Sequence, residues 1–545
     1  MSSILNSIIN NMHAIQILID DTSNKIMYPK HKRITTEKIL IKNQIDESNL
    51  NPGVQIQKIY DEYNDFIQEE KRKTSEKVEN EETKIEQYLK LEHLFGEKSN
   101  IFSSLINQLF SSIKENIINK NENVFNEEIE NNLNKIIISL KEFDNKLNDL
   151  EKSTKELIAE KIKKANILIN KIYDINIDIR YFPIKQLPNR IESYIEKRDH
   201  LIDELNNIIG IKVTKDHDEF KVFLNSGMCI IDDYKKYNLI TLTSSLDDKY
   251  ISVGCWDDEN KLKKIEHMIL SGSLGALFEF RNGDLENSRN KIGQLTINFA
   301  DSINRYHTIG YDSLGNPGKQ VFNISDPKII SSSTNELHPS VSIKWVNTSN
   351  AQDSNYVVLS ENNHWTITRL KDHKIINPEI YQDNDNTFIT FDGIELRFRT
   401  KNSTEGNIYM IKPYFNTLSE LRLLIVKNNP LALSSTNDLS QINKNNAIII
   451  HNLNKDELVD KTETLFQSYL RFLKYLSYKC NDLEEKVPFE RNMIKILDNK
   501  KLSTSDDNID ENYQKLSYEQ KCYLANAKIL KLAENIFNEI VECYS

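Results

Sequence analysis

The sequence contains few of the residues that build extended, cross-linked or membrane-spanning proteins. Glycine (14) and proline (11) are scarce among 545 residues, which disfavours a collagen-like or extended disordered chain and leaves long helices plausible. The five cysteines are odd in number, far apart and without a Cys-x-x-Cys pair, so we expect neither a disulfide framework nor a zinc site. No apolar run approaches the ~20 residues that cross a bilayer. The N-terminus lacks the basic segment and cleavage site of a signal peptide.

The chain also lacks an excess of positive charge. Its 70 Lys and Arg residues face 81 Asp and Glu residues, which gives a net charge of -11. Affinity for nucleic acid comes largely from Lys and Arg at the phosphates, so this balance argues against a nucleic-acid partner. Taken alone, these features describe a cytoplasmic protein of two to four domains, with export that needs no cleaved signal left open.

Recognisable catalytic motifs are missing too. The sequence has no G-x-S-x-G, no P-loop and no G-x-G-x-x-G. The acidic cluster Asp216–Glu219 lies between two expected strands and is interpreted as a hairpin turn rather than a metal site. Cys255 has no histidine nearby, so we expect a buried cysteine rather than a reactive thiol. Asn362–Trp365 is typical of a turn that leads into a strand. We therefore expect no catalytic, cofactor-binding or metal-binding residues, no cofactor, and a protein that is not an enzyme.

Apolar residues recur at helical spacing along much of the chain. Spacings of four and three after residue 53 predict a helix through Ile56 and Ile67, and the charged run 71–84 is interpreted as its solvated part. A long 4-3 repeat then shifts by one place after Leu150, which favours a bundle over an uninterrupted supercoil. The repeat contains Ile136, Leu140, Phe143, Leu147, Leu150, Ile158, Ile162, Ala165, Ile169 and Ile172. Residues 190–209 predict another helix, which Gly210 closes.

The period changes to two in the middle of the chain. Strands are predicted at 211–213, 220–223 and within 239–253, and a helix at 274–306. Between 330 and 415 lie further short strands, split by turn residues, that predict a small antiparallel sandwich or barrel. They are 341–345, 356–359, 365–368 and 388–391. Helices resume near Leu418, and a late stripe runs from Leu465 to Val487.

Both ends of the chain carry apolar stripes that need a cover. A short terminal helix cannot bury its own apolar face, so the other terminus, a neighbouring subunit or both must do so. The expected assembly interface consists of Ile4, Leu5, Ile8, Met12, Ile15 and Ile19 at the N-terminus, and of Leu516, Tyr523, Leu530 and Phe537 at strict seven-residue spacing in a last helix from Asp510 onward. The expected fold class is α+β and multidomain, with a long helical bundle or coiled-coil rod from both chain ends and inserted β-rich domains.

Several segments resemble the bacterial flagellar axial proteins, and among them the hook-associated proteins. The N-terminal helix ends in Thr22-Ser23-Asn24, which is similar to the family's Thr-Ser-x-Asn step, and residues 53–63 are similar to the start of its first long helix. The most specific stretch is Ser271–Arg281, which the Gly315–Gly318 turn follows. Residues 518–537 look like the family's C-terminal signature. Two joints depart from the family pattern, at 25–30 and at 505–512.

The resemblance implies a structural subunit of the bacterial flagellum that joins hook to filament. Such a subunit is exported through the flagellar type III apparatus without a cleaved signal peptide and is secreted to the hook tip outside the cell. The implied partners are other copies of itself in a ring, the hook protein, a second hook–filament junction protein and a dedicated export chaperone. Neither nucleic acid nor membrane insertion is implied. The implied inner helical domain consists of 1–50, its N-terminal half with a connector, and 501–545, its C-terminal half. Between them lie 51–330 as a mainly helical rod domain with a small β insertion near 211–258, 331–415 as a β-rich outer domain and 416–500 as a returning rod segment.

Two alternatives remain at this stage. A cytoplasmic helical adaptor or scaffold with a β-rich binding module would show the same periodicities. Within the flagellar family, the hook protein and the second junction protein are closer rivals, and Ser271–Arg281 with the Gly315–Gly318 turn favours the first junction protein.

Overall fold

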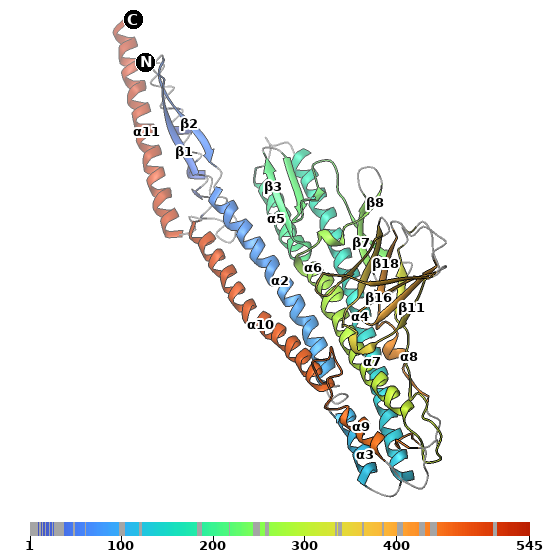
Figure 1. The fold of residues 1–545 in the computed structure, drawn as a ribbon. Coiled ribbons are helices and arrows are strands. Elements are labelled where there is room, and N and C mark those ends of the chain that lie inside the picture. Colours follow the sequence, from blue (N-terminus) through green and yellow to red (C-terminus); the bar gives the residue numbers. More distant parts are fainter. Residues whose placement is uncertain are drawn as a thin grey trace. The chain divides into compact units, whose positions relative to one another are not determined.

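The computed structural model divides into two compact units, each built from separate stretches of the chain (Figure 1). Unit 1 contains Met1–Val78, Lys171–Asn207 and Val487–Ser545, and unit 2 contains Glu79–Asn170 and Ile208–Lys486. The structure describes residues 38–46, 49–59, 62–97, 104–118, 122–181, 188–216, 219–243, 251–256, 261–332, 335, 341–361, 364–383, 386–399, 407–424, 431–436, 444–504 and 509–544, with single positions between 9 and 26.

Unit 1 begins with a β-hairpin that the sequence analysis missed. Strand β1 (Lys38–Asp46) pairs antiparallel with β2 (Asn49–Ile59), with Ile41 opposite Ile56. The prediction of a helix through Ile56 was wrong, because helix α2 (Glu62–Glu97) begins only after the hairpin. Val54 and Ile56 alternate with polar residues at the strand period of two, but Ile56 also fits the four-three spacing that continues into α2.

Four helical segments pack together in unit 1. They are the first part of α2, the last part of α4 (Glu122–Tyr181), most of α5 (Pro188–Ile209) and the second part of α10 (Leu465–Thr504). Ile67, Ile172 and Ile202 are buried among them. Gly210 follows α5 with a φ of 59°, which confirms the predicted left-handed end of this helix.

The charged run of α2 is only partly solvated, so its interpretation as a solvated face was incomplete. Nε of Arg72 lies 2.7 Å from Oδ1 of Asp203 on α5, and Asn206 donates a hydrogen bond of 2.7 Å to the carbonyl oxygen of Arg72. Lys71 pairs with Asp498 of α10 at 2.5 Å. Acidic residues on neighbouring helices therefore hold part of the run inside the bundle, because a paired charge is far cheaper to bury than an isolated one.

The long apolar repeat forms one side of helix α4, and the structure confirms the prediction that it is a packing seam. All ten of its residues are buried, and α4 continues without a break across the one-residue shift. Thr154 fills the shifted turn: it is fully buried, and its hydroxyl donates a hydrogen bond of 2.8 Å to the carbonyl oxygen of Leu150. The seam therefore steps by four three times in succession, from Leu150 to Ile162, which is a local adjustment of the kind known as a stutter.

Unit 2 has a helical body with small sheets attached. Besides the remaining parts of α2 and α4, it contains α3 (Ile106–Ile118), α6 (Gly272–Glu279), α7 (Glu286–Ile309), α8 (Thr417–Glu420) and α9 (Asn445–Asn452). The main core joins these to the first half of α10, whose Leu465, Tyr469 and Leu476 from the predicted late stripe are buried. Short 3-10 turns span Glu266–Met268 and Thr348–Asn350, and a π-helical turn spans Phe280–Leu285 between α6 and α7.

Two three-stranded sheets and one short pair belong to the helical body. Strands β3 (Ile211–Asp216), β4 (Glu219–Leu224) and β5 (Cys229–Ile231) form the first sheet, and β6 (Leu239–Thr243), β7 (Ile251–Trp256) and β8 (Leu262–Lys264) form the second. Strand β9 (Phe322–Asn323) pairs with β19 (Arg422–Leu423). Asp216 pairs with Glu219, as the predicted hairpin requires, and the turn residues 217 and 218 lie outside the described residues.

The predicted sandwich lies between residues 328 and 412. One sheet has the order β10-β18-β12-β13-β14 and the other the order β11-β17-β16-β15, all antiparallel. The strands are β10 (Lys328–Ser331), β11 (Val341–Trp345), β12 (Tyr356–Glu361), β13 (His364–Arg369), β14 (Lys374–Ile376), β15 (Glu379–Asp383), β16 (Asn386–Phe391), β17 (Ile394–Arg399) and β18 (Ile408–Lys412).

The two sheets of the sandwich enclose a separate apolar core, in which Tyr356, Phe398 and Tyr409 are almost fully buried. Asp392 and Gly393, with φ values of 42° and 79°, form the tight turn between β16 and β17. The carboxylate of Asp392 also accepts hydrogen bonds from Arg369 at 2.6 Å and from the Tyr356 hydroxyl at 2.9 Å. These hydrogen bonds fix the turn to the neighbouring sheet.

The division of the chain into five segments stays a prediction.

Candidate assembly surface

The C-terminal helix α11 (Ile509–Tyr544) carries the predicted seven-residue stripe on one side. Leu516, Tyr523 and Leu530 are half-buried in the chain. The fourth member, Phe537, lies in the same helix, but its side chain is outside the described residues. The stripe is thus neither fully covered nor fully open in the described part of the helix.

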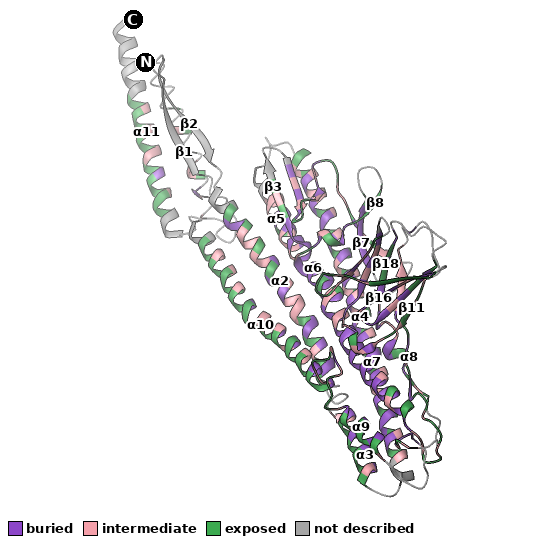
Figure 2. Ribbon diagram, viewed as in Figure 1, coloured by how far each residue is buried: buried purple, intermediate pink, exposed green. Residues whose placement is uncertain are grey.

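Other sides of α11 carry large apolar side chains that the sequence analysis did not single out. Tyr513 and Leu524 lie eleven residues apart, as do Tyr518 and Ile529, and eleven residues are about three turns, so each pair shares a face. These four side chains and Leu532 are 50 to 69% exposed. Figure 2 accordingly shows the described part of α11 largely as exposed or intermediate surface. The helix therefore presents apolar groups on more than one side.

The last part of α10, which also belongs to unit 1, presents a second exposed apolar row. Phe489, Met493 and Ile496 are spaced by four and three and are all exposed. This spacing was present in the sequence, directly after the late stripe, and it could have been identified there. Pro488 precedes the row within the helix and removes one backbone hydrogen bond at that point.

The N-terminal stripe is described only in part. Met12, Ile15 and Ile19 are helical and half-buried, while His13, Gln16 and Asp20 beside them are exposed, which agrees with an amphipathic helix. Ile4, Leu5 and Ile8 lie outside the described residues. So does much of the two departures from the family pattern at 25–30 and 505–512, namely residues 27–30 and 505–508. The role of the ten predicted residues in assembly stays a prediction.

The strongest buried electrostatic cluster lies in unit 2 and joins three helical segments. The Tyr88 hydroxyl of α2 donates a hydrogen bond of 2.5 Å to Asp284 in the π-helical turn, and Nζ of Lys479 on α10 lies 2.9 Å from the same carboxylate. Burial and the charge of Asp284 raise the pKa of Tyr88 above its usual range. Burial lowers the pKa of Lys479, but the hydrogen bond with Tyr475 and the charge of Asp284 outweigh it, so that pKa is raised. The shifts keep the phenol neutral and the ammonium charged, which suits a structural clamp.

A second buried pair holds the small sheets against the π-helical turn. Nη2 of Arg281 lies 2.6 Å from Oε1 of Glu266, and both side chains are less than a tenth exposed. Another nitrogen of Arg281 donates to the carbonyl oxygen of Ile251 on β7. Arg281 ends the Ser271–Arg281 segment, so the most specific stretch of the sequence anchors a junction between elements.

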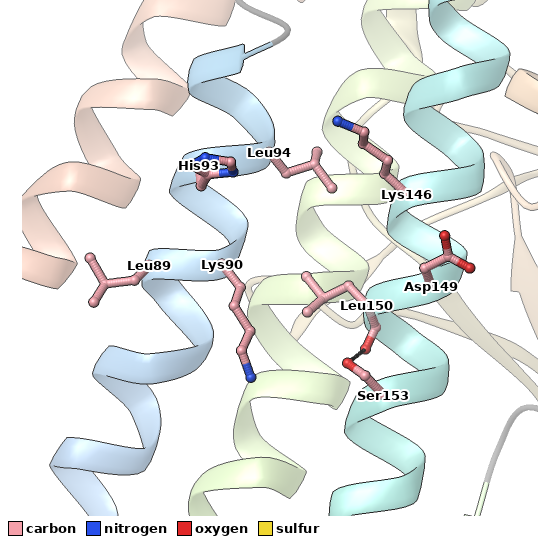
Figure 3. Close-up of a pocket in the computed structure, with 8 residues that line it drawn as sticks. All are labelled: Leu89, Lys90, His93, Leu94, Lys146, Asp149, Leu150 and Ser153. Atoms are coloured by element: carbon pink, nitrogen blue, oxygen red, sulfur yellow. Dashed lines mark hydrogen bonds between the residues drawn. The ribbon is translucent and has the colours of Figure 1, made fainter.

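An open groove of about 540 Å³ lies between α2 and α4 in unit 2 (Figure 3). Leu94 and Leu150 contribute its apolar lining, and Lys90, Lys146 and Asp149 contribute charge. Lys90 is paired with Glu86 at 2.7 Å. The groove's other lining residues are Leu89, His93 and Ser153. The Ser153 hydroxyl donates to the carbonyl oxygen of its own helix, so it does not point at His93 as a nucleophile would point at its base.

Two other features are absent from the part of the chain that the structure describes. No group of three or more His, Cys, Asp or Glu residues is placed to hold a metal ion there. Among the same residues, no helix has the length and apolar character needed to cross a membrane. Cys255 is buried as expected, and its thiol donates to the carbonyl oxygen of Trp256.

Two family models match adjoining parts of the chain. Residues 88–322 match the model described as the Flagellar hook-associated protein FlgK helical domain, and residues 330–413 match that of the Flagellar hook-associated protein 1, D2-like domain. The first match covers most of the helical body with its small sheets, and the second covers the sandwich.

Known proteins resemble the chain over its whole length. Flagellar hook-associated protein 1 of Buchnera aphidicola subsp. Schizaphis graminum is 65% identical over 546 residues and is covered completely, as is this chain. The protein of the same name from Salmonella typhimurium is 25% identical, with 99% of this chain and 100% of that protein covered. Among solved structures, the flagellar hook junction protein FlgK from Burkholderia pseudomallei has the same fold, with a TM-score of 0.69 at 13% identity over 80% of this chain and 99% of that one.

Proposed function

Because the chain belongs to the flagellar hook-associated protein 1 family, we propose that it is a structural subunit that joins the flagellar hook to the filament. Its work in this proposal is mechanical and not catalytic. The proposal keeps the five-segment division of the chain, in which the two chain ends form one inner helical domain and the sandwich forms an outer one.

One observation of the structure carries the proposal. Helix α11 has 36 residues, ~54 Å at 1.5 Å per residue, and exposes Tyr518, Leu524 and Ile529 on sides that do not belong to its half-buried stripe. Fully burying one side chain of this size is worth ~1.5–3 kcal/mol. Several such groups on one helix therefore favour a partner that surrounds it. Neighbouring copies of the same chain, packed side by side, would supply such a surrounding.

The same surfaces suggest the partners and the route. Subunits assemble into a ring through their terminal helices, with the hook protein on one side and a second junction protein on the other. Before assembly, exposed apolar helices are an aggregation hazard, so a dedicated chaperone covers them. The subunit leaves the cell through the flagellar type III apparatus and is located at the hook tip.

Removing either terminal segment tests this proposal. Deletion of residues 1–20 or 515–545 should leave unit 2 folded, because its two cores contain no residue from those segments. Assembly on purified hooks should be lost, since the terminal helices supply the contacts between copies. Electron microscopy would show the rings, and circular dichroism would show the remaining fold. Rings formed by a chain without both segments would refute the mechanism.

A point variant gives a sharper version of the same test. Leu524→Lys and Ile529→Lys place a charge on exposed positions of α11, so the free chain should keep its fold while ring assembly falls at least tenfold per substitution. Gln520→Lys is the matched control, because it adds the same charge at an exposed polar position of this helix. Equal loss with all three variants would mean that charge alone, and not apolar burial, decides assembly.

Cell fractionation separates this function from that of an adaptor. A junction subunit should be found in purified hook-basal bodies and outside the cell. A cytoplasmic adaptor with a β-rich binding module would stay in the cytosol and be absent from those preparations.

A further inference from the structure

The two outer faces of the sandwich differ in chemistry. On the four-stranded sheet, charged groups occupy the outward positions of β11 and β17: Lys344 pairs with Glu395 at 2.9 Å, and Arg397 and Arg399 are exposed. The same face continues on β16 and β15 with Phe388 and Tyr381, an aromatic pair that Arg397 contacts. An antiparallel sheet with one face in water normally has polar outward residues.

The outward face of the five-stranded sheet is uncharged only in its middle, between Lys328 and Lys412 at one end and His364 at the other. One row crosses all five strands in register, with each residue directly opposite the next. It consists of Ile330, Met410, Val357, Thr368 and Ile375, and the neighbouring row adds Ile408, Leu359 and Thr366. Neither row contains an ionisable side chain.

The register and the burial agree that these residues point away from the core. Val358, Ile367 and Ile411, at the alternate positions of the same strands, are fully buried in the sandwich core. Side chains alternate between the two faces of a strand, so the rows of Ile330 and Ile408 lie on the other face. Ile375 is 63% exposed, Ile408 39% and Met410 36%.

We propose that this outer face of the five-stranded sheet binds the sandwich domain of a neighbouring copy of the same chain. The inference rests on the proposed function, because it needs copies that are already held side by side. The face, formed by the rows of Ile330 and Ile408, is called the outer β face below.

The size of the outer β face argues for this occupant. A stable, freestanding protein interface buries ~800 Å² on each partner and uses roughly 20–30 residues a side. Eight residues fall well short of that, so the outer β face cannot hold a partner by itself. It can bind a partner that other contacts keep at a high effective concentration. Identical chains joined through their terminal helices place equivalent sandwiches next to one another at the same level, which a partner from another layer does not do.

Photo-cross-linking in assembled rings tests the contact. The full chain carries the photoreactive amino acid p-benzoylphenylalanine in place of Met410 or, as the control, in place of Ser342, an exposed outward residue of the four-stranded sheet. Rings on purified hooks should give covalent dimers of this chain from position 410 and not from position 342. The same protein at equal concentration in free solution should give none.

The outcomes separate the inference from the proposal beneath it. Rings that give no dimer from position 410, equal yields from both positions, or a product with a different axial protein overturn the inference and leave the proposed function standing. Failure of the unmodified chain to form rings overturns both. A product from position 410 in free solution means a stable solution dimer and contradicts the argument from size.

A second measurement does not depend on the photoreactive group. Met410→Lys places a charge in the centre of the outer β face and should release subunits from washed rings about tenfold faster, because the burial of one such side chain shifts an equilibrium by about that factor. Ser342→Lys should leave release unchanged. Tryptophan fluorescence, to which Trp345 and Trp365 of the sandwich contribute, checks that both variants are folded. Equal release rates for Met410→Lys and the unmodified chain would overturn the inference.

Discussion

Asp284 connects three helical segments of unit 2, and its removal should weaken this unit strongly. The carboxylate accepts a hydrogen bond from Tyr88 of α2 at 2.5 Å and pairs with Lys479 of α10 at 2.9 Å, while its own backbone belongs to the π-helical turn. It is 4% exposed. Asp284→Ala therefore leaves a buried phenol and a half-buried ammonium without their shared acceptor.

The size of the effect follows from these contacts. Breaking a buried ion pair by removing one partner costs ~3–5 kcal/mol, because the other charge remains without compensation. The side chain of Lys479 is 33% exposed, so water recovers part of that cost. We expect Asp284→Ala to lower the free energy of unfolding by about 3 kcal/mol. Asp284→Asn should cost less, since its amide oxygen still accepts the Tyr88 hydrogen bond.

Urea unfolding followed by tryptophan fluorescence measures the loss in the full chain. All three tryptophans, at 256, 345 and 365, belong to unit 2, so the signal reports this unit. The matched control is Asp482→Ala, which removes an exposed pair with Lys486 from the same helix α10 and should leave the unfolding midpoint nearly unchanged. A loss below about 1 kcal/mol for Asp284→Ala would refute the reasoning, because that is the value of an exposed pair.

The dependence on pH gives an independent check of the same cluster. The pKa values of Tyr88 and Lys479 are both raised in the fold, from ordinary values of 10.0 and 10.5. Their contribution to stability is therefore complete below pH ~10 and is lost as the pH rises above it, when the unfolded chain loses protons first. The unmodified chain should lose stability between pH 10 and 11 more steeply than Asp284→Ala. Parallel curves would contradict the assigned role of the carboxylate.

Two further predictions concern the helical body. Gly272 has a φ of 67°, and a Cβ there would lie 2.6 Å from the carbonyl carbon of Ile208. Gly272→Ala should therefore lower the free energy of unfolding, measured with urea, by at least ~1–3 kcal/mol. An unchanged free energy would mean that the Ser271–Arg281 segment does not need glycine at this position. Burial lowers the pKa of His307, whose Nε2 accepts a hydrogen bond from the backbone N–H of Ala432 while Nδ1 lies 2.6 Å from the carbonyl oxygen of Lys319. The unfolded chain therefore binds this proton first, and stability should fall as the pH drops below 6.5, with a smaller slope in His307→Gln; equal slopes would exclude His307 as the cause.

The sequence predicted long, strictly periodic elements well because one face of each is wholly buried. Helix α4 is the clearest case, since every apolar residue of its repeat lies in a core. The repeat shifts by one place because Leu150 and Ile158 lie eight residues apart, and the position midway between them belongs to Thr154. Its hydroxyl is satisfied by the carbonyl oxygen of Leu150, so the residue packs as an apolar one would. A pattern of apolar residues leaves out a buried polar side chain whose hydrogen bond is made within its own helix.

Features that depend on pairing were harder to predict. The hairpin of β1 and β2 was missed because its residue Ile56 also fits the start of a helical repeat, and only the opposite strand decides between the two. The ion pairs of Arg72 with α5 were missed for a related reason: a charged run predicts solvent exposure until its partners are known. The outer β face required the register of five strands, since no single strand shows which of its faces is outward.

Helix α11 shows that a periodic pattern identifies one side of a helix and leaves out apolar groups on its other sides. A seven-residue repeat selects one stripe, and Leu516, Tyr523 and Leu530 on that stripe are half-buried within a single chain. The side chains with most surface left to bury, Tyr518, Leu524 and Leu532, lie elsewhere on α11. If contacts within one chain use the stripe and contacts between copies use the other sides, substitutions in the stripe should lower the stability of the free chain, while substitutions at Leu524 should lower assembly alone. A helix with apolar groups on several sides therefore serves both purposes, and the seven-residue repeat by itself identifies only the first.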